Sequence, residues 1–424
     1  MDNLLKNVGL LNFHYEKTNF GANFVAFALQ EVVKKLGFNP QIINFNPERQ
    51  QDKENKFISE KFYDFKNKFL YMTEEYTSRF QLSQLNERFN QFITGSDQVW
   101  NAAITRENTG IYYLDFVNTE KNKISYAASM GRYSPTINET LNQSIKNNLN
   151  RLDFISVRES SALKVIQENY NIEKEIVEVL DPTLLLDAED YNPILNSEKH
   201  RDLPANKYLA FYFLADRTAP VKNYEKQDFF NFEKRIGLES VNCYGYKTKY
   251  ENKAVFKYNS MADWLNIIKN SSLVVTDSFH GICFSIIYKK NFIYKNTATT
   301  VNSRILDLLS KLGIKERIFE NYDDVTIDFA LNPIDYDFVY KKLNEEKEKS
   351  INFLQNALNS ALDKDFIIKK MSLALEERDN ELKKYKKNNI PIKEIIWKKW
   401  LDIFYKLPEP IKIIIRFFRK TKVY

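Results

Sequence analysis

Short apolar segments alternate with helical patterns through most of this chain, and this alternation is what most limits its fold. The first unit predicts a strand at Val8–Phe13, a helix from about Asn23 to Leu36 and a second strand at Gln41–Phe45. The helix is predicted because its apolar residues recur at intervals of three and four residues. A strand, a helix and a strand in direct succession form a crossover between parallel neighbours, so the sequence predicts a parallel sheet.

The alternation continues in two series on either side of a polar stretch at 186–204. This stretch holds Asn192-Pro193 and Asp202-Leu203-Pro204, which are typical of a connection between domains. Before it, strands are predicted at Gln91–Thr94, Lys123–Ala127, Phe154–Val157 and Ile176–Leu180, with an inserted helical pair at 47–90. After it, strands are predicted at Tyr208–Leu214, Ser240–Tyr244, Leu273–Thr276 and Asn291–Tyr294, with helices within 225–236 and at Ala262–Asn270, Gly281–Tyr288 and Ser303–Leu312.

A chain of 424 residues is too long for one hydrophobic core. We therefore expect an α/β fold with two Rossmann-like domains, at 1–200 and 201–332, and a cleft between them. Residues 333–363 predict a helix that packs back on the first domain. Residues 364–424 predict a C-terminal helical extension, which forms a basic amphipathic tail.

The composition excludes several classes of protein. An apolar fraction of 43% is that of a globular protein, and the two cysteines, Cys243 and Cys283, exclude a disulfide framework or a four-cysteine zinc site. We expect no metal site and a reduced, cytoplasmic setting. The first residues lack the pattern of a signal peptide, and no apolar run approaches the ~20 residues of a spanning helix.

The positive charge of the chain is concentrated in its tail. The net charge is +6, but residues 381–424 alone carry thirteen Lys and Arg against four Asp and Glu. The rest of the chain is therefore mildly acidic, which argues against a nucleic-acid-binding core. The chain also lacks a phosphate-binding loop of the Walker type and the Gly-x-Ser-x-Gly turn of esterases.

Residues 389–424 combine that charge with an apolar stripe. Ile396, Trp397, Trp400, Leu401 and Phe404 fall at helical spacing, and lysines flank them. Basic amphipathic helices with tryptophans are typical of anionic membrane surfaces. We expect a peripheral location on the inner face of the membrane, and the alternative is a helix that docks on a partner protein or on the enzyme itself.

The segment Thr276-Asp277-Ser278-Phe279-His280-Gly281 places a histidine where a buried strand ends and a helix begins. Free N–H groups and the positive end of the helix dipole favour an anion at such a corner. A histidine beside an anion is a suitable proton donor or acceptor near neutral pH. The alternative is a histidine that caps the helix or packs in the core.

Four other segments have similar positions at the ends of strands or the starts of helices. Three of them also have a structural interpretation: a helix cap for the first two, with Trp100 in the core, and an ion pair for Arg158. The candidate residues are Asn19 and Gly21 before the first long helix, Asp97, Gln98, Trp100 and Asn101 after the third strand, Arg158 after the fifth, and Arg304 at a late helix start.

Together these segments resemble the polysaccharide pyruvyl transferase family. The resemblance spans residues 8–312, and its most specific parts are the stretch around Asp97 and the Asp-Ser-Phe-His-Gly segment. It rests on Phe13-His14, Asn19-Phe20-Gly21-Ala22, Thr94-Gly95-Ser96-Asp97-Gln98-Val99-Trp100-Asn101, Ser125-Tyr126-Ala127-Ala128-Ser129, Ser156-Val157-Arg158-Glu159, Leu180-Asp181-Pro182-Thr183-Leu184-Leu185, the His280 segment and Asn302-Ser303-Arg304.

The resemblance implies a glycosyltransferase-B-like fold with two facing Rossmann-like domains. It also implies transfer of a pyruvyl group from phosphoenolpyruvate, the donor substrate, to two hydroxyls of a saccharide or lipid-linked glycan, with no cofactor. His280 would then be the general acid, and Asp97 would activate or orient the acceptor hydroxyl. The implied donor contacts are Asn19, Gly21, Arg158, Ser278, Gly281 and Arg304, and the implied acceptor contacts are Gln98, Trp100 and Asn101.

The chain departs from the family pattern at Ser278, where well-understood members carry a donor-binding arginine. A hydroxyl donates one hydrogen bond but supplies no charge, so another arginine substitutes or the donor differs. Two other functions remain open: a glycosyltransferase of the same architecture that uses a nucleotide sugar, and a non-catalytic member that binds a glycan or acts as a scaffold.

Overall fold

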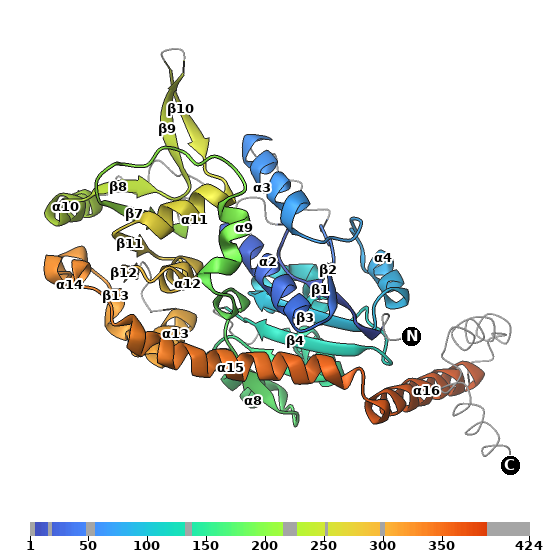
Figure 1. Ribbon diagram of the computed structural model, residues 1–424. Coiled ribbons are helices and arrows are strands. Elements are labelled where there is room, and N and C mark those ends of the chain that lie inside the picture. The colour runs from blue at the N-terminus through green and yellow to red at the C-terminus, as the bar shows by residue number, and fades with distance from the viewer. Residues whose placement is uncertain are drawn as a thin grey trace.

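The computed structural model of the protein describes residues 5–15, 19–47, 56–131, 138–214, 227–250, 253–296 and 302–387. Within these ranges the chain forms two parallel sheets surrounded by helices, a β-hairpin and two C-terminal helices (Figure 1). The expected α/β fold, with two Rossmann-like halves and a C-terminal helical extension, is confirmed.

The first sheet contains six parallel strands in the order β2-β1-β3-β4-β5-β6. Its strands are β1 (Asn7–Leu11), β2 (Asn39–Ile42), β3 (Gln91–Asp97), β4 (Asn122–Ala128), β5 (Phe154–Val157) and β6 (Ile176–Glu178). The direction of strand succession reverses between β1 and β3, and ligands of open α/β sheets bind at such a reversal, beyond the carboxyl ends of the strands. Residues 12–15, which follow β1, and residues 97–101, at the end of β3, lie at this reversal.

The second sheet contains five parallel strands in the order β13-β12-β11-β7-β8. Its strands are β7 (Tyr208–Tyr212), β8 (Glu239–Asn242), β11 (Leu273–Thr276), β12 (Phe292–Lys295) and β13 (Ile318–Phe319). Here the reversal lies between β7 and β11, so α12 (Phe279–Ile287) begins beside it. The hairpin β9 (Gly245–Tyr250) and β10 (Lys253–Tyr258), which the sequence did not predict, projects away from this sheet (Figure 1).

Helices connect the strands as the alternating pattern predicts. In the first half they are α2 (Phe20–Lys35), α3 (Lys56–Phe69), α4 (Arg79–Ser83), α5 (Ala102–Thr105), α6 (Thr109–Tyr112), α7 (Glu139–Arg151) and α8 (Ser160–Tyr170), and α9 (Asn192–Leu195) follows. In the second half they are α10 (Gln227–Ile236), α11 (Met261–Asn270), α13 (Ser303–Leu312) and α14 (Ile327–Leu331).

Aromatic side chains join the two halves into one core. The Phe24 ring of α2 lies 4.6 Å from the ring of Phe284 on α12 and 5.3 Å from that of Trp264 on α11, measured between centroids. The Phe20 ring stacks on Trp264 at 5.8 Å. These side chains are fully buried, and aromatic pairs of this kind contribute about 0.5–1.5 kcal/mol each beyond their buried area. Their packing fixes the start of α2 against the start of α12.

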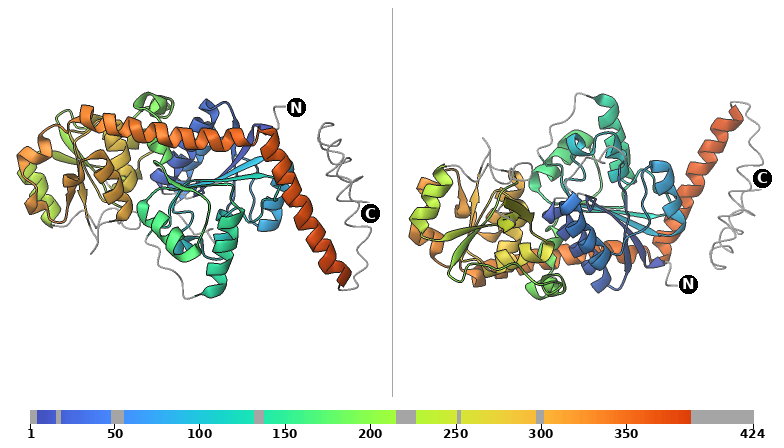
Figure 2. Two further views of the ribbon diagram at one scale, coloured as in Figure 1. Left: turned by 90° about the horizontal axis from the view of Figure 1, so that it is seen from below. Right: turned by 90° about the horizontal axis from the view of Figure 1, so that it is seen from above.

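Two long helices follow the second sheet. Helix α15 (Tyr336–Ser360) runs along both halves (Figure 2): Tyr340 donates to the carbonyl of Ile286 in α12, and Ser350 accepts from the amide of Leu180 in the first half. Helix α16 (Lys364–Lys387) is attached to the first sheet by an ion pair of 2.9 Å between Lys370 Nζ and Asp153 Oδ2.

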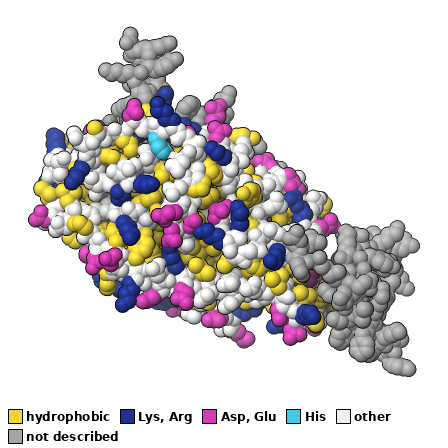
Figure 3. All heavy atoms as spheres, viewed as in Figure 1, with side chains coloured by type: hydrophobic (Ala, Val, Ile, Leu, Met, Phe, Trp, Pro, Cys, Tyr) yellow, Lys and Arg dark blue, Asp and Glu magenta, His cyan; other side chains and the backbone are white. Residues whose placement is uncertain are grey.

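The predicted amphipathic tail at 389–424 lies outside the described residues. None of the described helices is long and apolar enough to cross a membrane. On the face shown in Figure 3, acidic and basic side chains are interspersed among apolar ones.

Candidate active site

The candidate active site lies where the carboxyl ends of the first sheet meet the starts of α12 and α13. The structure brings His280, Asp97, Arg158 and Arg304 together there, although up to 207 positions separate them in the sequence. It adds Asp181, which directly precedes Pro182 beyond β6. Interactions of 2.7–3.9 Å link these five side chains into one network.

Arg158 lies at the centre of this network. Its Nη1 donates to Asp181 Oδ2 at 2.7 Å, its Nη2 donates to Asp97 Oδ1 at 3.2 Å, and its guanidinium lies over the ring of Phe279. The side chain is only 1% exposed. Burial lowers the pKa of Arg158, but the carboxylates of Asp97 and Asp181 outweigh burial and raise it well above its usual value. Arg158 therefore forms a fixed bridge between two carboxylates, in keeping with the ion-pair interpretation of this residue.

Asp181 is the most completely bonded carboxylate of the site. Its Oδ1 accepts from the Thr183 amide at 3.1 Å and from Thr183 Oγ1 at 2.7 Å, and its Oδ2 accepts from Arg158 and, at 3.0 Å, from Ser96 Oγ. Burial raises the pKa of Asp181, but His280 and Arg158 outweigh burial and hold it well below its usual range. Asp181 is therefore ionised at neutral pH.

His280 lies in the first turn of α12, with its ring between Asp181 and the first turn of α2. Its Nε2 is 3.7 Å from Asp181 Oδ2 and has no hydrogen-bond partner within the described structure. On the α2 side, a Cβ atom added to Gly21 would lie 2.1 Å from His280 Nδ1, so only glycine allows the helix to come this close.

Capping residues hold the two helix starts in place. Asn19 accepts from the Ala22 amide at 3.2 Å, and Ser278 accepts from the Gly281 amide at 3.4 Å. A Cβ atom added to Gly281 would lie 2.4 Å from Thr276 Oγ1, so a glycine here allows the first turn of α12 to lie close to the end of β11. The first turns of α2 and α12 contain no acidic residue. Both starts can therefore contribute positive potential to an anion beside His280.

Asp97 and Arg304 form the other side of the site. Asp97 has φ +68°, in the left-handed region, and its Oδ1 is 3.9 Å from Arg304 Nη1. Burial raises the pKa of Asp97, but Arg158, His280 and Arg304 outweigh burial and lower it, so this carboxylate is ionised at neutral pH. Arg304 donates to Asn302 Oδ1 at 3.1 Å, and burial lowers its pKa.

The remaining sequence candidates lie beyond Asp97, in a different setting. Trp100 is fully buried, stacks on Tyr113 at 4.8 Å and donates to the Tyr112 carbonyl, so its ring is a core side chain with no surface for an acceptor. Gln98 and Asn101 are half-buried and bond to each other at 3.0 Å. Asn101 also caps α5 by accepting from the Ala103 amide.

Sequence reasoning proposed no catalytic or binding role for two acidic residues of the site. Asp181 follows a strand end, as Asp97 and Arg158 do, and that position was the available signal. Glu159 is fully buried, accepts from the Met130 amide at 3.0 Å and lies 3.9 Å from Arg158 Nε. Burial raises the pKa of Glu159 despite the opposing effect of Arg158 and Arg304.

The described residues contain no group of three or more His, Cys, Asp or Glu side chains placed to hold a metal ion. Cys243 and Cys283 are buried, and burial raises the pKa of each thiol.

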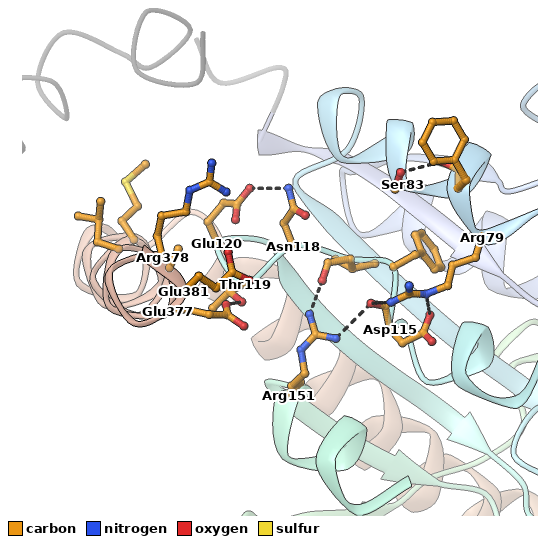
Figure 4. A pocket seen from close by; sticks show the side chains of 16 residues that line it. Arg79, Ser83, Asp115, Asn118, Thr119, Glu120, Arg151, Glu377, Arg378 and Glu381 are labelled. Atoms are coloured by element: carbon orange, nitrogen blue, oxygen red, sulfur yellow. Dashed lines mark hydrogen bonds and ion pairs between the residues drawn. The ribbon is translucent and has the colours of Figure 1, made fainter. Parts of the chain in front are cut away.

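A separate pocket of about 540 Å³ lies between α16 and the first half (Figure 4). The pocket lies at the amino ends of the strands, because its residues 115–120 precede β4 and Arg151 precedes β5. The candidate active site lies at the carboxyl ends. Arg79 pairs with Asp115 there, and Arg151 donates to the Asp115 and Val117 carbonyls.

The solved structures to which this chain is similar include an epimerase and two transferases. A UDP-GlcNAc 2-epimerase from Methanocaldococcus jannaschii, solved with UDP-GlcNAc and UDP, is 11% identical, with a TM-score of 0.45 over 77% of this chain and 93% of that chain. A glycosyltransferase from Rickettsia africae is 11% identical, with a TM-score of 0.40 over 87% and 98%. The E. coli ADP-heptose lipopolysaccharide heptosyltransferase II is 10% identical, with a TM-score of 0.37 over 80% and 99%.

No curated protein matches this chain significantly. The family model for polysaccharide pyruvyl transferase, in contrast, matches residues 19–297, which contain Asn19, Gly21, Asp97, Arg158, Asp181 and His280. This match covers most of the chain, and the chain therefore belongs to the polysaccharide pyruvyl transferase family.

Proposed function

We propose that this protein transfers a pyruvyl group from phosphoenolpyruvate to two hydroxyls of one sugar in a surface-polysaccharide precursor, forming a cyclic ketal. Family membership supports the reaction class. The observation that carries the proposal is the position of His280, whose ring lies between the starts of α2 and α12 and beside a network of two arginines and two carboxylates. This arrangement suits proton transfer next to a bound anion.

The donor binds at the two helix starts, with Arg304 as its principal cation. Phosphoenolpyruvate carries a carboxylate and a phosphate, and amides at a helix start bind such groups. Arg158 is already committed to Asp97 and Asp181. Among the described residues, Arg304 is 3.9 Å from its nearest carboxylate and has Asn302 as its only hydrogen-bond partner. Arg304 therefore supplies the charge that Ser278 lacks, and Ser278 and Gly281 shape the helix start.

His280 acts as general acid. It gives a proton to the methylene carbon of the enol, which becomes a methyl group, and the central carbon becomes electrophilic. One sugar hydroxyl attacks this carbon, phosphate leaves, and the neighbouring hydroxyl attacks second to close the ketal. Each hydroxyl loses its proton as its C–O bond forms. One of these two protons replaces the proton that His280 gave up and the other leaves with the phosphate, so the products are the ketal and inorganic phosphate.

Asp97 orients the acceptor. Its pKa is lowered, so it is ionised and accepts a hydrogen bond from the attacking hydroxyl. A carboxylate with a lowered pKa is a weak base. The main contribution of Asp97 is therefore to fix the position of the hydroxyl and to stabilise its proton as that proton leaves. Gln98 and Asn101 remain the proposed neighbours of the acceptor.

We assign the acceptor to a saccharide or lipid-linked glycan at the inner face of a membrane. The argument is the basic, tryptophan-containing pattern of residues 389–424, which suits an anionic surface. The enzyme would then act as a peripheral membrane protein on the cytoplasmic side.

The test is ligand-dependent thermal unfolding of the purified protein with phosphoenolpyruvate and with a panel of nucleotide sugars. A ligand that binds only the folded state stabilises it by about 2.7 kcal/mol at a hundredfold excess over its dissociation constant. We expect stabilisation by phosphoenolpyruvate that decreases in Arg304→Gln, and phosphate release with a diol acceptor that is lost in His280→Ala. Stabilisation by a nucleotide sugar alone would overturn the proposal in favour of a glycosyltransferase.

A further inference from the structure

We propose that Asp181 is the positioning residue of His280: it receives the Nε2 proton of the ring and so makes Nδ1 the atom that delivers the proton to the donor. This inference rests on the proposed pyruvyl transfer, because it assigns the acid step of that reaction to one ring nitrogen. Asp181 acts through His280 and contacts no substrate in this scheme.

The geometry separates the two nitrogens of the ring. Nε2 is 3.7 Å from Asp181 Oδ2, is buried and has no hydrogen-bond partner in the described structure. Nδ1 faces the first turn of α2, where the Cα of Gly21 leaves no room for a side chain. One nitrogen therefore faces a carboxylate inside the protein, and the other faces the helix start where the anionic donor is proposed to bind.

Asp181 is well suited to hold the ring. Four hydrogen bonds, two from Thr183 and one each from Arg158 and Ser96, fix both of its oxygens, and its side chain is fully buried. The distance of 3.7 Å exceeds a hydrogen bond, and a movement of under about 1 Å closes it. Catalytic hydrogen bonds commonly tighten in this way when substrate binds.

Four charged side chains surround the ring. Arg158, which follows β5, and Arg304, in the first turn of α13, are the cations of the site. Asp97, at the end of β3, and Asp181 are the ionised acids that offset them, while burial raises the pKa of Glu159. Of the two ionised acids, Asp181 is the one within ion-pair distance of the ring.

The proton balance follows from the tautomer. A neutral ring with its proton on Nε2, directed at Asp181, has a lone pair on Nδ1. Nδ1 takes up a proton as the anionic donor binds and then loses it to the methylene carbon: the N–H bond breaks, a C–H bond forms, and the ring returns to its starting tautomer. Asp181 keeps its charge throughout, as the carboxylate partner of a catalytic histidine does.

The experiment is ¹⁵N NMR of the histidine rings in the full-length protein, combined with steady-state kinetics. The chain has three histidines, so the spectrum is simple, and His280→Ala assigns the signals. Asp181→Asn keeps the shape of the side chain but removes its charge. We expect this variant to lose the Nε2-protonated tautomer of His280 and to lower kcat by about 10²- to 10⁴-fold, with a much smaller change in KM for phosphoenolpyruvate.

Asp263→Asn is the matched control. Asp263 is also a buried carboxylate, also caps a helix, and also lies near a histidine, with 3.8 Å between its Oδ1 and His200 Nδ1. We expect it to lower stability while the tautomer of His280 stays unchanged. This control separates a general cost of removing a buried charge from a specific effect on His280.

An unchanged His280 tautomer in Asp181→Asn would overturn the inference. If Asp181→Asn does not fold, Thr183→Val replaces it. Valine keeps the volume of threonine but removes the 2.7 Å hydrogen bond to Asp181 Oδ1. An unchanged His280 tautomer and an unchanged kcat in Thr183→Val would also overturn the inference. The NMR measurement needs no substrate. Absence of pyruvyl transfer by the native enzyme would therefore count against the proposed function, while the tautomer alone decides the role of Asp181.

Discussion

Gly21 and His280 are so close that a Cβ atom on Gly21 would lie 2.1 Å from the Nδ1 atom of the imidazole. Real Cβ contacts essentially never fall below 3.0 Å, so the ring would have to move. The first turn of α2, in one half of the molecule, therefore packs directly against a histidine from the other half. This contact places the proposed general acid against a helix start that can hold an anion.

We predict that Gly21→Ala displaces the His280 ring and lowers kcat/KM for phosphoenolpyruvate by at least about tenfold, since a misplacement near 1 Å costs up to 10²-fold. The displaced ring lowers stability, but alanine favours helices by about 1 kcal/mol over glycine. Because these two effects oppose each other, the free energy of unfolding should change little. Kinetics and urea unfolding measure the two effects. Gly110→Ala is the control, because its Cβ would lie 2.4 Å from Asp115 Oδ2, far from the site. Native activity of Gly21→Ala would show that the ring does not need this position.

Asp97→Asn should lower kcat by about 10²-fold or more while KM for phosphoenolpyruvate changes less than about threefold. The substitution removes the charge that we propose orients the acceptor hydroxyl. Asparagine tolerates the left-handed backbone that Asp97 adopts at φ +68°, so the loop keeps its shape. Initial rates over a matrix of donor and acceptor concentrations give both constants. A defect confined to donor binding would place Asp97 in a different role.

Arg158→Gln should destabilise the protein by about 3–5 kcal/mol, because it leaves two buried carboxylates without their shared partner. Arg304→Gln should cost much less stability and should instead raise KM for phosphoenolpyruvate, since Asn302 is the one hydrogen-bond partner of Arg304 within the described part of the chain. Urea unfolding and steady-state kinetics of the two variants separate these effects. Equal stability losses would contradict the division of roles between the two arginines.

The stability of the protein should fall as the pH is lowered from 6.5 to 4, and His14 should contribute to this loss. Burial, together with the charge of Lys66, lowers the pKa of His14 to about 4. Between these pH values the unfolded chain binds a proton that the folded chain does not. Stability is therefore full above pH 6.5 and falls by up to about 3 kcal/mol by pH 4.

Urea unfolding of the native protein and of His14→Gln over this range measures that contribution. The variant should show a shallower dependence of the free energy of unfolding on pH, and His200→Gln controls for the substitution itself. The paired carboxylates Asp97 and Asp181 have lowered pKa values, so their contribution is present above about pH 4 and is lost below it. Parallel curves for the native protein and His14→Gln would exclude His14 as a source of the pH dependence.

Deletion of residues 389–424 should release the protein from vesicles that contain anionic lipid, and it should leave phosphate release with a soluble acceptor unchanged. The segment carries nine Lys and Arg against three Asp and Glu, together with two tryptophans. Co-sedimentation with anionic and neutral vesicles at low and high salt measures the effect. Trp397→Ala with Trp400→Ala tests the apolar stripe separately. Equal co-sedimentation of the full-length and shortened proteins would favour docking on a protein surface.

Much of the fold could be predicted from the sequence because local patterns determine it. The strands at Phe154–Val157 and Leu273–Thr276 and the helix at Ser303–Leu312 have the predicted bounds, since each is an apolar run or a helical stripe with clear polar limits. The hairpin β9–β10 was missed, because among the described strands its two strands pair only with each other, and they contain several lysines. Helix α12 begins two residues earlier than predicted, since Ser278 is its capping residue.

The sequence also indicated which strand ends and helix starts carry polar side chains, but it could not assign their partners. Phe13-His14 follows the first strand as Asp97 follows the third, yet His14 is buried and bonds to Asn44, while Trp100 packs against Tyr113. Arg158 was a candidate for the donor, and the structure places it between Asp97 and Asp181.

The sequence by itself thus determined the two parallel sheets, the elements that join them and the family to which the chain belongs. Only the tertiary structure decided that Asp181 faces His280, that Gly21 lies against the same ring and that Arg158 bridges two carboxylates. The physical reason is that periodicity and capping act between near neighbours in the chain. The contacts of the site depend instead on how α2 packs on α12 through Phe24 and Phe284, which lie 260 positions apart.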